Sequence, residues 1–240
     1  MKIFMPVSVL LLVSLGSNAQ KVDTIKTNSG NLLIHFLGHG SLMLEYNQKI
    51  IHIDPWCNVA NYDKLPKADL VLITHHHGDH LDSSALSKVV GSKTEIYWTA
   101  LCSKNSTFRA KGNIVGNGDN FSTLGIAIKA VPAYNIVNKR PNGETLHPKG
   151  EGNGYIFAFA NVNVYVAGDT ENIPEMKNFG NIDIAFLPMN LPYTMTPGMV
   201  KEAAVMLKPK ILYPYHYGET DTNKITALLK DYKDIEVRIR

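Results

Sequence analysis

Short apolar, β-branched runs bounded by turn residues recur along most of the sequence, and this pattern restricts the fold more than any other feature. Runs of this length and composition are typical of β-strands. We predict strands at residues 32–36, 42–46, 49–53, 70–74, 126–131, 155–160, 163–167, 182–187 and 211–215. The runs 155–160 and 163–167 are so close in sequence that they are expected to form a hairpin.

Helical patterns are fewer. Thr196 and Pro197 suit the N-cap and the first position of a helix, and the apolar residues that follow fall on one face. Asp221 is predicted to cap a second helix, and residues 82–90 are a third candidate. Many strands with interspersed helices indicate a sheet-rich α/β layer protein.

The N-terminus has the order of a secretory signal. Met1 and Lys2 precede an apolar run over residues 4–15, and small residues up to Ala19 precede Gln20. We predict a signal peptide at residues 1–19 and one domain at residues 20–240, exported to the periplasm or secreted without a stable membrane anchor. The apolar run is short for a bilayer span, although retention as an N-terminal anchor stays an alternative.

Composition excludes several classes of protein. The 240 residues are 45% hydrophobic and 19% charged with a net charge of +3, which argues against disorder and against nucleic acid as a partner. The partner expected is a small-molecule substrate, and the oligomeric state is open. Cys57 and Cys102 are compatible with a disulfide in an oxidising compartment or with two free thiols.

The nine histidines are unevenly distributed, and four of them fall within residues 75–80, directly after a predicted strand. Neutral imidazole and carboxylate are good ligands for divalent metals. Alternate side chains of an extended segment face the same way, so His75 and His77 can meet one ion while His76 points away. Gly78 then lets the chain turn, so that Asp79 and His80 can reach a second position.

Further candidate ligands follow other predicted strands. Asp169 follows residues 163–167, His216 follows residues 211–215, and His147 lies in a long polar loop at residues 134–154. A histidine tract that merely scavenges metal would need no such partners. Their joint placement after strands favours an ordered site.

The segment His75-x-His77-x-Asp79-His80 resembles the signature of the metallo-β-lactamase fold superfamily. The resemblance runs from about residue 38 to about residue 218. It includes the later ligand motifs in order, at His147, Asp169 and His216, and an Asp that ends a strand and supports the ligands, at Asp54. Within the superfamily the chain is similar to a branch of metal-dependent hydrolases that resembles ascorbate-phosphate lactonases and, more distantly, phospholipase-D-type phosphodiesterases.

The resemblance implies a four-layer αββα sandwich with two mixed β-sheets and a site at their shared edge. It also implies two divalent metal ions, with Zn²⁺ expected first and Mn²⁺ or Fe²⁺ also suited to the N/O ligands. One ion would be held by His75, His77 and His147, the other by Asp79, His80 and His216, and Asp169 would lie between them.

Such a site predicts a hydrolase in which a metal-bridging hydroxide cleaves an ester, a lactone or a phosphodiester. Clinical metallo-β-lactamases have no bridging acid at the position of Asp169, so β-lactamase activity is not expected. Asp79 is a candidate proton acceptor, and Tyr193 is a candidate donor to a developing oxyanion. His39 is expected to support the site, and Lys149 to bind a substrate anion or to be solvated. The alternative is a periplasmic metal-binding or sensing protein with little turnover.

Overall fold

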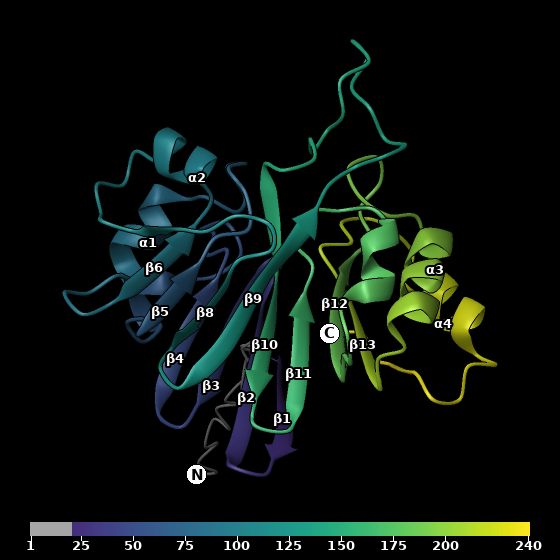
Figure 1. Ribbon diagram of the computed structural model, residues 1–240, viewed down its shortest axis with the longest axis horizontal. Helices are drawn as coiled ribbons and strands as arrows, with labels where there is room; N and C mark the ends of the chain where they lie inside the picture. Colours follow the sequence, from purple (N-terminus) through teal and green to yellow (C-terminus); the bar gives the residue numbers. More distant parts are fainter. Residues whose placement is uncertain (1–20) are drawn as a thin grey trace, which may run out of the picture.

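Two mixed β-sheets pack face to face and carry helices on their outer faces, as Figure 1 shows. The computed structural model describes residues 21–240, so the predicted signal peptide lies outside the described residues. Among residues 21–240, none of the helices combines the length and the apolar character needed to cross a bilayer.

The first sheet has seven strands in chain order, β1 to β7. The pairs up to β3–β4 are antiparallel and the later pairs are parallel. Its strands are β1 (Lys21–Thr27), β2 (Gly30–Gly38), β3 (Ser41–Tyr46), β4 (Lys49–Ile53), β5 (Leu70–Leu72), β6 (Glu95–Trp98) and β7 (Asn113–Ile114).

The second sheet mirrors this design, with seven strands in the order β14 to β8. The pairs from β8 to β11 are antiparallel, and those from β11 to β14 are parallel. Its strands are β8 (Asn120–Thr123), β9 (Ile126–Ala133), β10 (Gly152–Phe159), β11 (Val162–Val166), β12 (Ile184–Pro188), β13 (Ile211–Tyr215) and β14 (Glu236–Val237).

Three apolar layers hold the sandwich together. The largest lies between the two sheets and contains Leu44, Phe157 and Phe186. A second layer packs the first sheet against α1 (Ser83–Val89), α2 (Ala100–Asn105) and the short 3₁₀ helix η1 (Tyr62–Lys64). A third packs the other sheet against α3 (Pro197–Leu207), α4 (Asn223–Leu229) and η2 (Pro174–Asn178). The predicted αββα architecture is therefore confirmed.

All nine predicted strands are present within two or three residues of their expected ends, and β10 and β11 form the predicted hairpin. Thr196 caps α3 through its hydroxyl, and Asp82 caps α1. The prediction for α4 was wrong by one residue: Thr222 is the N-cap, although the Asp221 carboxylate still accepts the backbone N–H of Asn223. Both cysteines are free thiols.

Candidate metal centre

The carboxyl ends of several strands deliver polar side chains to one edge of the sandwich. The segment after β5 carries residues 75–80, and the loops after β11 and β13 carry Asp169 and His216. His147 comes from the long loop between β9 and β10, which rises above this edge in Figure 1. The structure brings all seven predicted ligands into adjoining groups of donor atoms, and His39 joins one of them.

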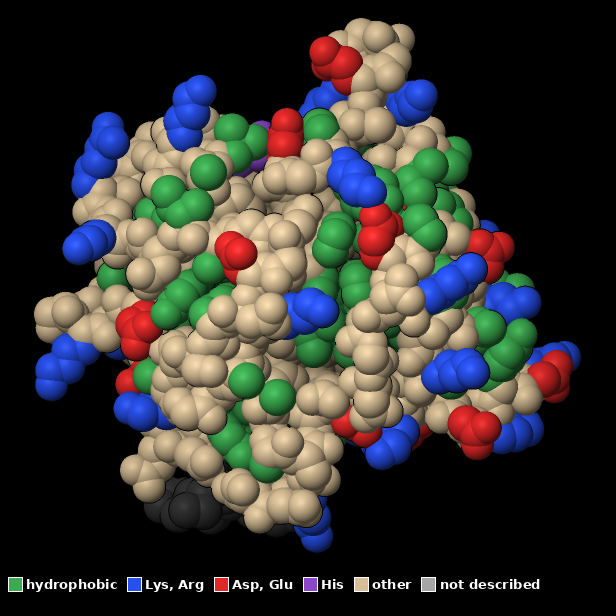
Figure 2. Space-filling model, viewed as in Figure 1, with side chains coloured by type: hydrophobic (Ala, Val, Ile, Leu, Met, Phe, Trp, Pro, Cys, Tyr) green, Lys and Arg blue, Asp and Glu red, His purple; other side chains and the backbone are tan. Residues whose placement is uncertain are grey.

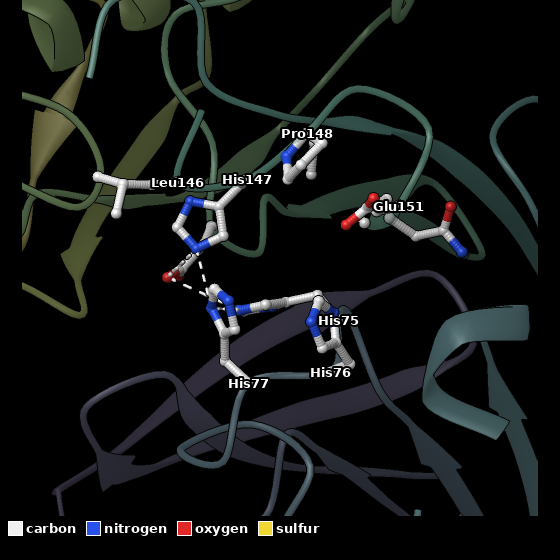
Figure 3. A pocket seen from close by; sticks show the side chains of 11 residues that line it. His75, His76, His77, Leu146, His147, Pro148 and Glu151 are labelled. Atoms are coloured by element: carbon white, nitrogen blue, oxygen red, sulfur yellow. Dashed lines mark hydrogen bonds and ion pairs between the residues drawn. The ribbon is translucent and has the colours of Figure 1, made fainter. Parts of the chain in front are cut away.

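The first group consists of His75, His77 and His147. Nδ1 of His77 lies 3.1 Å from Nε2 of His75 and 3.2 Å from Nε2 of His147. Figure 3 shows the three rings converging from the two loops. Ligands of a tetrahedral Zn²⁺ at 2.0–2.1 Å lie about 3.3 Å from one another, so these nitrogens are spaced as three ligands of one ion would be.

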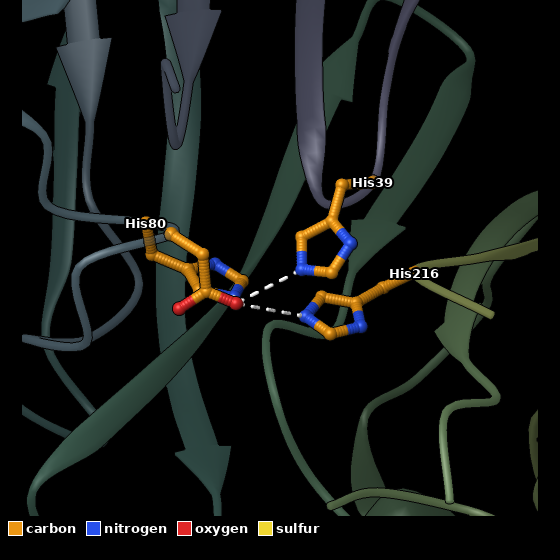
Figure 4. Close-up of side chains that lie close together, drawn as sticks. His39, His80 and His216 are labelled. Atoms are coloured by element: carbon orange, nitrogen blue, oxygen red, sulfur yellow. Dashed lines mark hydrogen bonds and ion pairs between the residues drawn. The ribbon is translucent and has the colours of Figure 1, made fainter. Parts of the chain in front are cut away.

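The second group consists of Asp79, His80, His216 and His39. Oδ2 of Asp79 lies 3.6 Å from Nε2 of His80 and 3.5 Å from Nε2 of His216. Nε2 of His39 lies only 2.9 Å from the same oxygen, and its ring packs against that of His216 with centroids 3.6 Å apart. Figure 4 shows both rings pointing at this carboxylate. His39 therefore contacts Asp79 directly, as a support for the site or as a further nitrogen donor.

Asp169 lies between the two groups and turns one oxygen to each. Its Oδ2 is 3.3 Å from Nε2 of His147, and its Oδ1 is 3.5 Å from Nε2 of His80 and also 3.5 Å from Nε2 of His216. The side chain is 4% exposed, so its charge has little access to water. This is the placement expected of a carboxylate shared by two cations.

Asp54, at the end of β4, fixes the tautomers of two histidines. It accepts the backbone N–H and the hydroxyl of Thr74, and its Oδ2 lies 2.7 Å from Nδ1 of His80. Because a carboxylate only accepts, the His80 proton sits on Nδ1. The Thr74 hydroxyl gives its hydrogen to Asp54, so it accepts from Nδ1 of His75 at 3.0 Å. The Nε2 atoms of both rings therefore face the site, and Nε2 of His75 offers a lone pair there.

The tautomer of His147 is fixed in the same way by Asn135. The Asn135 amide nitrogen donates to Glu171 and to the carbonyl of Tyr193, so its oxygen is the atom that accepts from Nδ1 of His147, at 2.5 Å. Glu171 is fully buried and also accepts three consecutive backbone N–H groups at residues 136–138. Sequence reasoning missed Asn135 and Glu171, although Glu171 stands only two residues after Asp169.

Three buried polar atoms at the meeting point of the groups have no hydrogen-bond partner among the described residues. They are Nε2 of His80, Nε2 of His216 and Oδ1 of Asp169. A buried polar atom without a partner costs free energy, and here three such atoms lie together. A divalent cation satisfies all of them at once, so the residues present fit a metal centre.

The charge states agree with this interpretation. Burial and the neighbouring His80 hold the pKa of His75 well below its usual range, and burial with His147 lowers that of His77 to about 4. Burial alone would raise the pKa of Asp169, but His216 and His80 hold it well below its usual range. His75 and His77 therefore offer neutral imidazoles, and the shared acid is ionised.

His80 behaves differently in the metal-free chain. Burial lowers the pKa of its imidazole, but the carboxylates of Asp169 and Asp54 outweigh burial and raise it to about 9. Gly40 leaves room for this ring, because a Cβ there would lie 2.8 Å from Cε1 of His80. A cation at this position therefore competes with a proton for Nε2.

The remaining candidates have other surroundings. The nitrogens of His76 join neither donor group, as the alternation argument predicts, although its ring lines the small cavity beside the first group. Lys149 forms an ion pair with Glu175 at 2.6 Å, which leaves it less available to a substrate anion. The Tyr193 phenol is half-exposed, and its hydroxyl has no hydrogen bond within residues 21–240. Its role as an oxyanion donor stays a prediction.

Comparison with known proteins agrees with the fold. Residues 33–216 match the family described as the beta-lactamase superfamily domain. A UPF0173 metal-dependent hydrolase from Pyrococcus horikoshii is 30% identical over 219 residues, which cover 85% of this chain and 95% of the relative.

Comparison with solved structures also supports the fold. A protein from Parabacteroides distasonis, assigned as a metal-dependent hydrolase, is 48% identical with a TM-score of 0.86, covering 92% of this chain and 98% of that one. Igni18, described as a metallo hydrolase from Ignicoccus hospitalis, shares the fold at 24% identity, with a TM-score of 0.69 and coverage of 87% and 94%.

The αββα sandwich and the paired donor groups at its edge define a metallo-β-lactamase-fold protein with a candidate metal centre. The sequence match covers most of the chain, so the protein belongs to the beta-lactamase superfamily domain family.

Proposed function

We propose that this chain is an exported, binuclear metal-dependent hydrolase that cleaves an ester, a lactone or a phosphodiester of a small molecule. The relatives named above as metal-dependent hydrolases support the general activity. Two divalent ions, Zn²⁺ in the first instance, would be held by the seven residues already described, with Asp169 shared between them.

The observation that carries the proposal is the position of Asp169. A metal store needs only a cluster of ligands, whereas here one buried carboxylate presents separate oxygens to two groups of imidazoles. Hydrogen bonds on the far side of each ring fix the orientation of His75, His80 and His147, so that their Nε2 atoms face the centre before any ion arrives. Such preorganisation is typical of catalytic metal sites.

Two divalent ions held by these residues would supply Lewis acidity and would activate water as a nucleophile near neutral pH. The chain's own residues position and charge the centre. Asp79 is a weak proton acceptor, because contacts with His216 and His39 hold its pKa well below the usual range against the effect of burial. Its main contribution is therefore negative charge. Tyr193 is the side chain proposed to donate to the oxygen that gains charge during cleavage.

A panel of substrates tests this function. Metal-loaded and EDTA-stripped protein would be compared on lactones, p-nitrophenyl esters, bis-p-nitrophenyl phosphate and nitrocefin. We expect turnover that requires metal on at least one ester, lactone or phosphodiester, and none on nitrocefin. Absence of metal-dependent turnover on every substrate would favour a metal-binding or sensing protein and contradict the proposal.

Export is proposed on the sequence of residues 1–19 alone. Expression of the full chain in a bacterial host, followed by N-terminal sequencing of the periplasmic fraction, is expected to give a mature protein that begins at Gln20. Recovery of the intact chain in the cytoplasm would contradict this part of the proposal.

A further inference from the structure

Four large hydrophobic side chains are exposed on two loops beside the metal centre. Ile136 and Val137 are 47% and 70% exposed in the loop after β9, and Leu191 and Tyr193 are 46% and 49% exposed in the loop after β12. We call these four residues the apolar lip. In Figure 2 hydrophobic side chains gather below the protruding loop, at the end of the molecule where the site lies.

The two loops are joined to each other. The side-chain amide of Asn135 donates to the carbonyl of Tyr193, and that of Asn138 donates to the carbonyl of Thr194. Since the same Asn135 side chain accepts from His147, one residue links the lip to the first donor group. The two loops that carry the lip are therefore tied to the first donor group through Asn135.

The backbone of the first lip loop, residues 136–138, is held by a buried carboxylate. Glu171 accepts the N–H groups of Ile136 and Val137, each at 2.7 Å, and that of Asn138 at 2.7 Å. Because a buried carboxylate already fixes three consecutive residues of this loop in the folded chain, a ligand that binds there does not have to order them. The result is a fixed loop that presents Val137 to water and not to the core.

We propose that the apolar lip binds an apolar acyl, alkyl or aryl portion of the substrate while the bond to be cleaved lies at the metal centre. This inference rests on the proposed function and specifies its substrate class: amphiphilic molecules with a hydrolysable polar head and an apolar tail. Rigid apolar surface beside a polar centre is how ligand sites combine affinity with orientation. A bound tail would also cover side chains that are otherwise in contact with water.

Alkylphosphonates from methyl to octyl test the lip without any turnover. The phosphonate is the anionic head for the zinc-loaded full chain, and only the tail varies. Burying a methylene is worth up to about fourfold in affinity, so the Kd is expected to fall by about two- to fourfold per added methylene until the tail outgrows the lip.

Two variants and a matched control assign the effect to the lip. Leu191→Ser and Val137→Ser are expected to flatten the dependence of Kd on chain length. Leu228→Ser on α4 removes a leucine of nearly equal exposure, 43% against 46%, and is expected to keep the wild-type dependence. Zinc content, measured for each variant, is expected to stay at the wild-type value because none of these side chains offers a ligand atom.

Several results would overturn the proposal. A wild-type Kd that does not depend on chain length, an absence of phosphonate binding, or an equal effect of Leu228→Ser would each do so. A wild-type dimer that Leu191→Ser dissociates, measured by light scattering, would assign the lip to a subunit contact instead. The substrate panel separates this inference from the proposed function: metal-dependent hydrolysis with flat phosphonate binding refutes the lip alone, and chain-length-dependent binding without hydrolysis refutes the hydrolase alone.

Discussion

Asp54→Asn tests whether preorganised tautomers control metal binding. The fully buried Asp54 carboxylate receives the backbone N–H of Thr74 on one oxygen and both the Thr74 hydroxyl and Nδ1–H of His80 on the other. In the variant the amide oxygen of residue 54 accepts the backbone N–H of Thr74. The amide NH₂ then faces the Thr74 hydroxyl and Nδ1 of His80, which both donated to the carboxylate. His80 must then accept at Nδ1 and carry its proton on Nε2, the atom that faces the metal.

The same substitution reaches the first donor group. The Thr74 hydroxyl can no longer donate to residue 54, so its hydrogen is free to turn toward Nδ1 of His75, 3.0 Å away, and to reverse that tautomer too. Backbone strain is not the cause, because Asp54 has a φ of 46°, a conformation that asparagine tolerates well. A lost charge-assisted hydrogen bond is worth about 1.5–3 kcal/mol, and supporting partners of ligands typically contribute about 10–100-fold in metal affinity.

We therefore expect both zinc affinities to fall by about 10- to 100-fold in Asp54→Asn, measured by competition with a chromophoric chelator. Asp183→Asn is the matched control, since Asp183 is also buried and accepts a backbone N–H, from Asn163, at the opposite end of the second sheet. The control is expected to lose stability without losing zinc affinity. Wild-type affinity in Asp54→Asn, or equal losses in the two variants, would refute the reasoning.

Three further predictions concern other residues. Asp169→Ala removes the shared anion, so we expect the zinc occupancy of at least one site to fall and activity to drop by orders of magnitude, while the circular dichroism spectrum is unchanged. Wild-type activity in this variant would contradict the site. His75→Ala and His77→Ala are expected to weaken zinc binding severely, whereas His76→Ala is expected to reduce zinc affinity and activity by at most about 10–100-fold. Equal losses of zinc affinity in the three variants would favour an unordered tract. Burial lowers the pKa of His52 to about 4 from 6.5, so its neutral form contributes up to about 3 kcal/mol of stability that is present above pH 6.5 and lost as the pH falls toward 4. His52→Gln, which can still donate to Pro66, is expected to reduce this loss in denaturant melts across that range, and an unchanged pH dependence would contradict the assignment.

The strands that were not predicted are instructive. Besides β6, they are β1, β7, β8 and β14, which are the four edge strands of the two sheets. Edge strands carry polar residues that discourage pairing with other chains, so they lack the apolar runs that identify interior strands. β1, for example, reads KVDTIKT with mostly exposed or half-exposed residues. Apolar patterning thus predicts the centre of each sheet better than its borders.

The candidate ligands could be predicted because each follows a recognisable strand or belongs to the histidine tract. Among their supports, Asp54 and His39 were also predicted, but three others could not be. Asn135, Glu171 and Thr74 are ordinary residues in the sequence, and they acquire a role only because distant segments fold against them: Glu171 meets residues 136–138 about 35 positions upstream. The supporting role of His39 was predicted, but its partner was not, because its contact with Asp79 spans 40 positions and depends on the turn between β2 and β3.

We propose that this chain holds two divalent ions in adjoining sites joined by Asp169. Elemental analysis of protein purified without chelator and reconstituted with Zn²⁺ and Mn²⁺ in turn, with protein concentration from amino-acid analysis, measures this directly. The structure predicts close to two ions per chain for at least one of the metals. A value of one ion or fewer with both metals would contradict the binuclear centre.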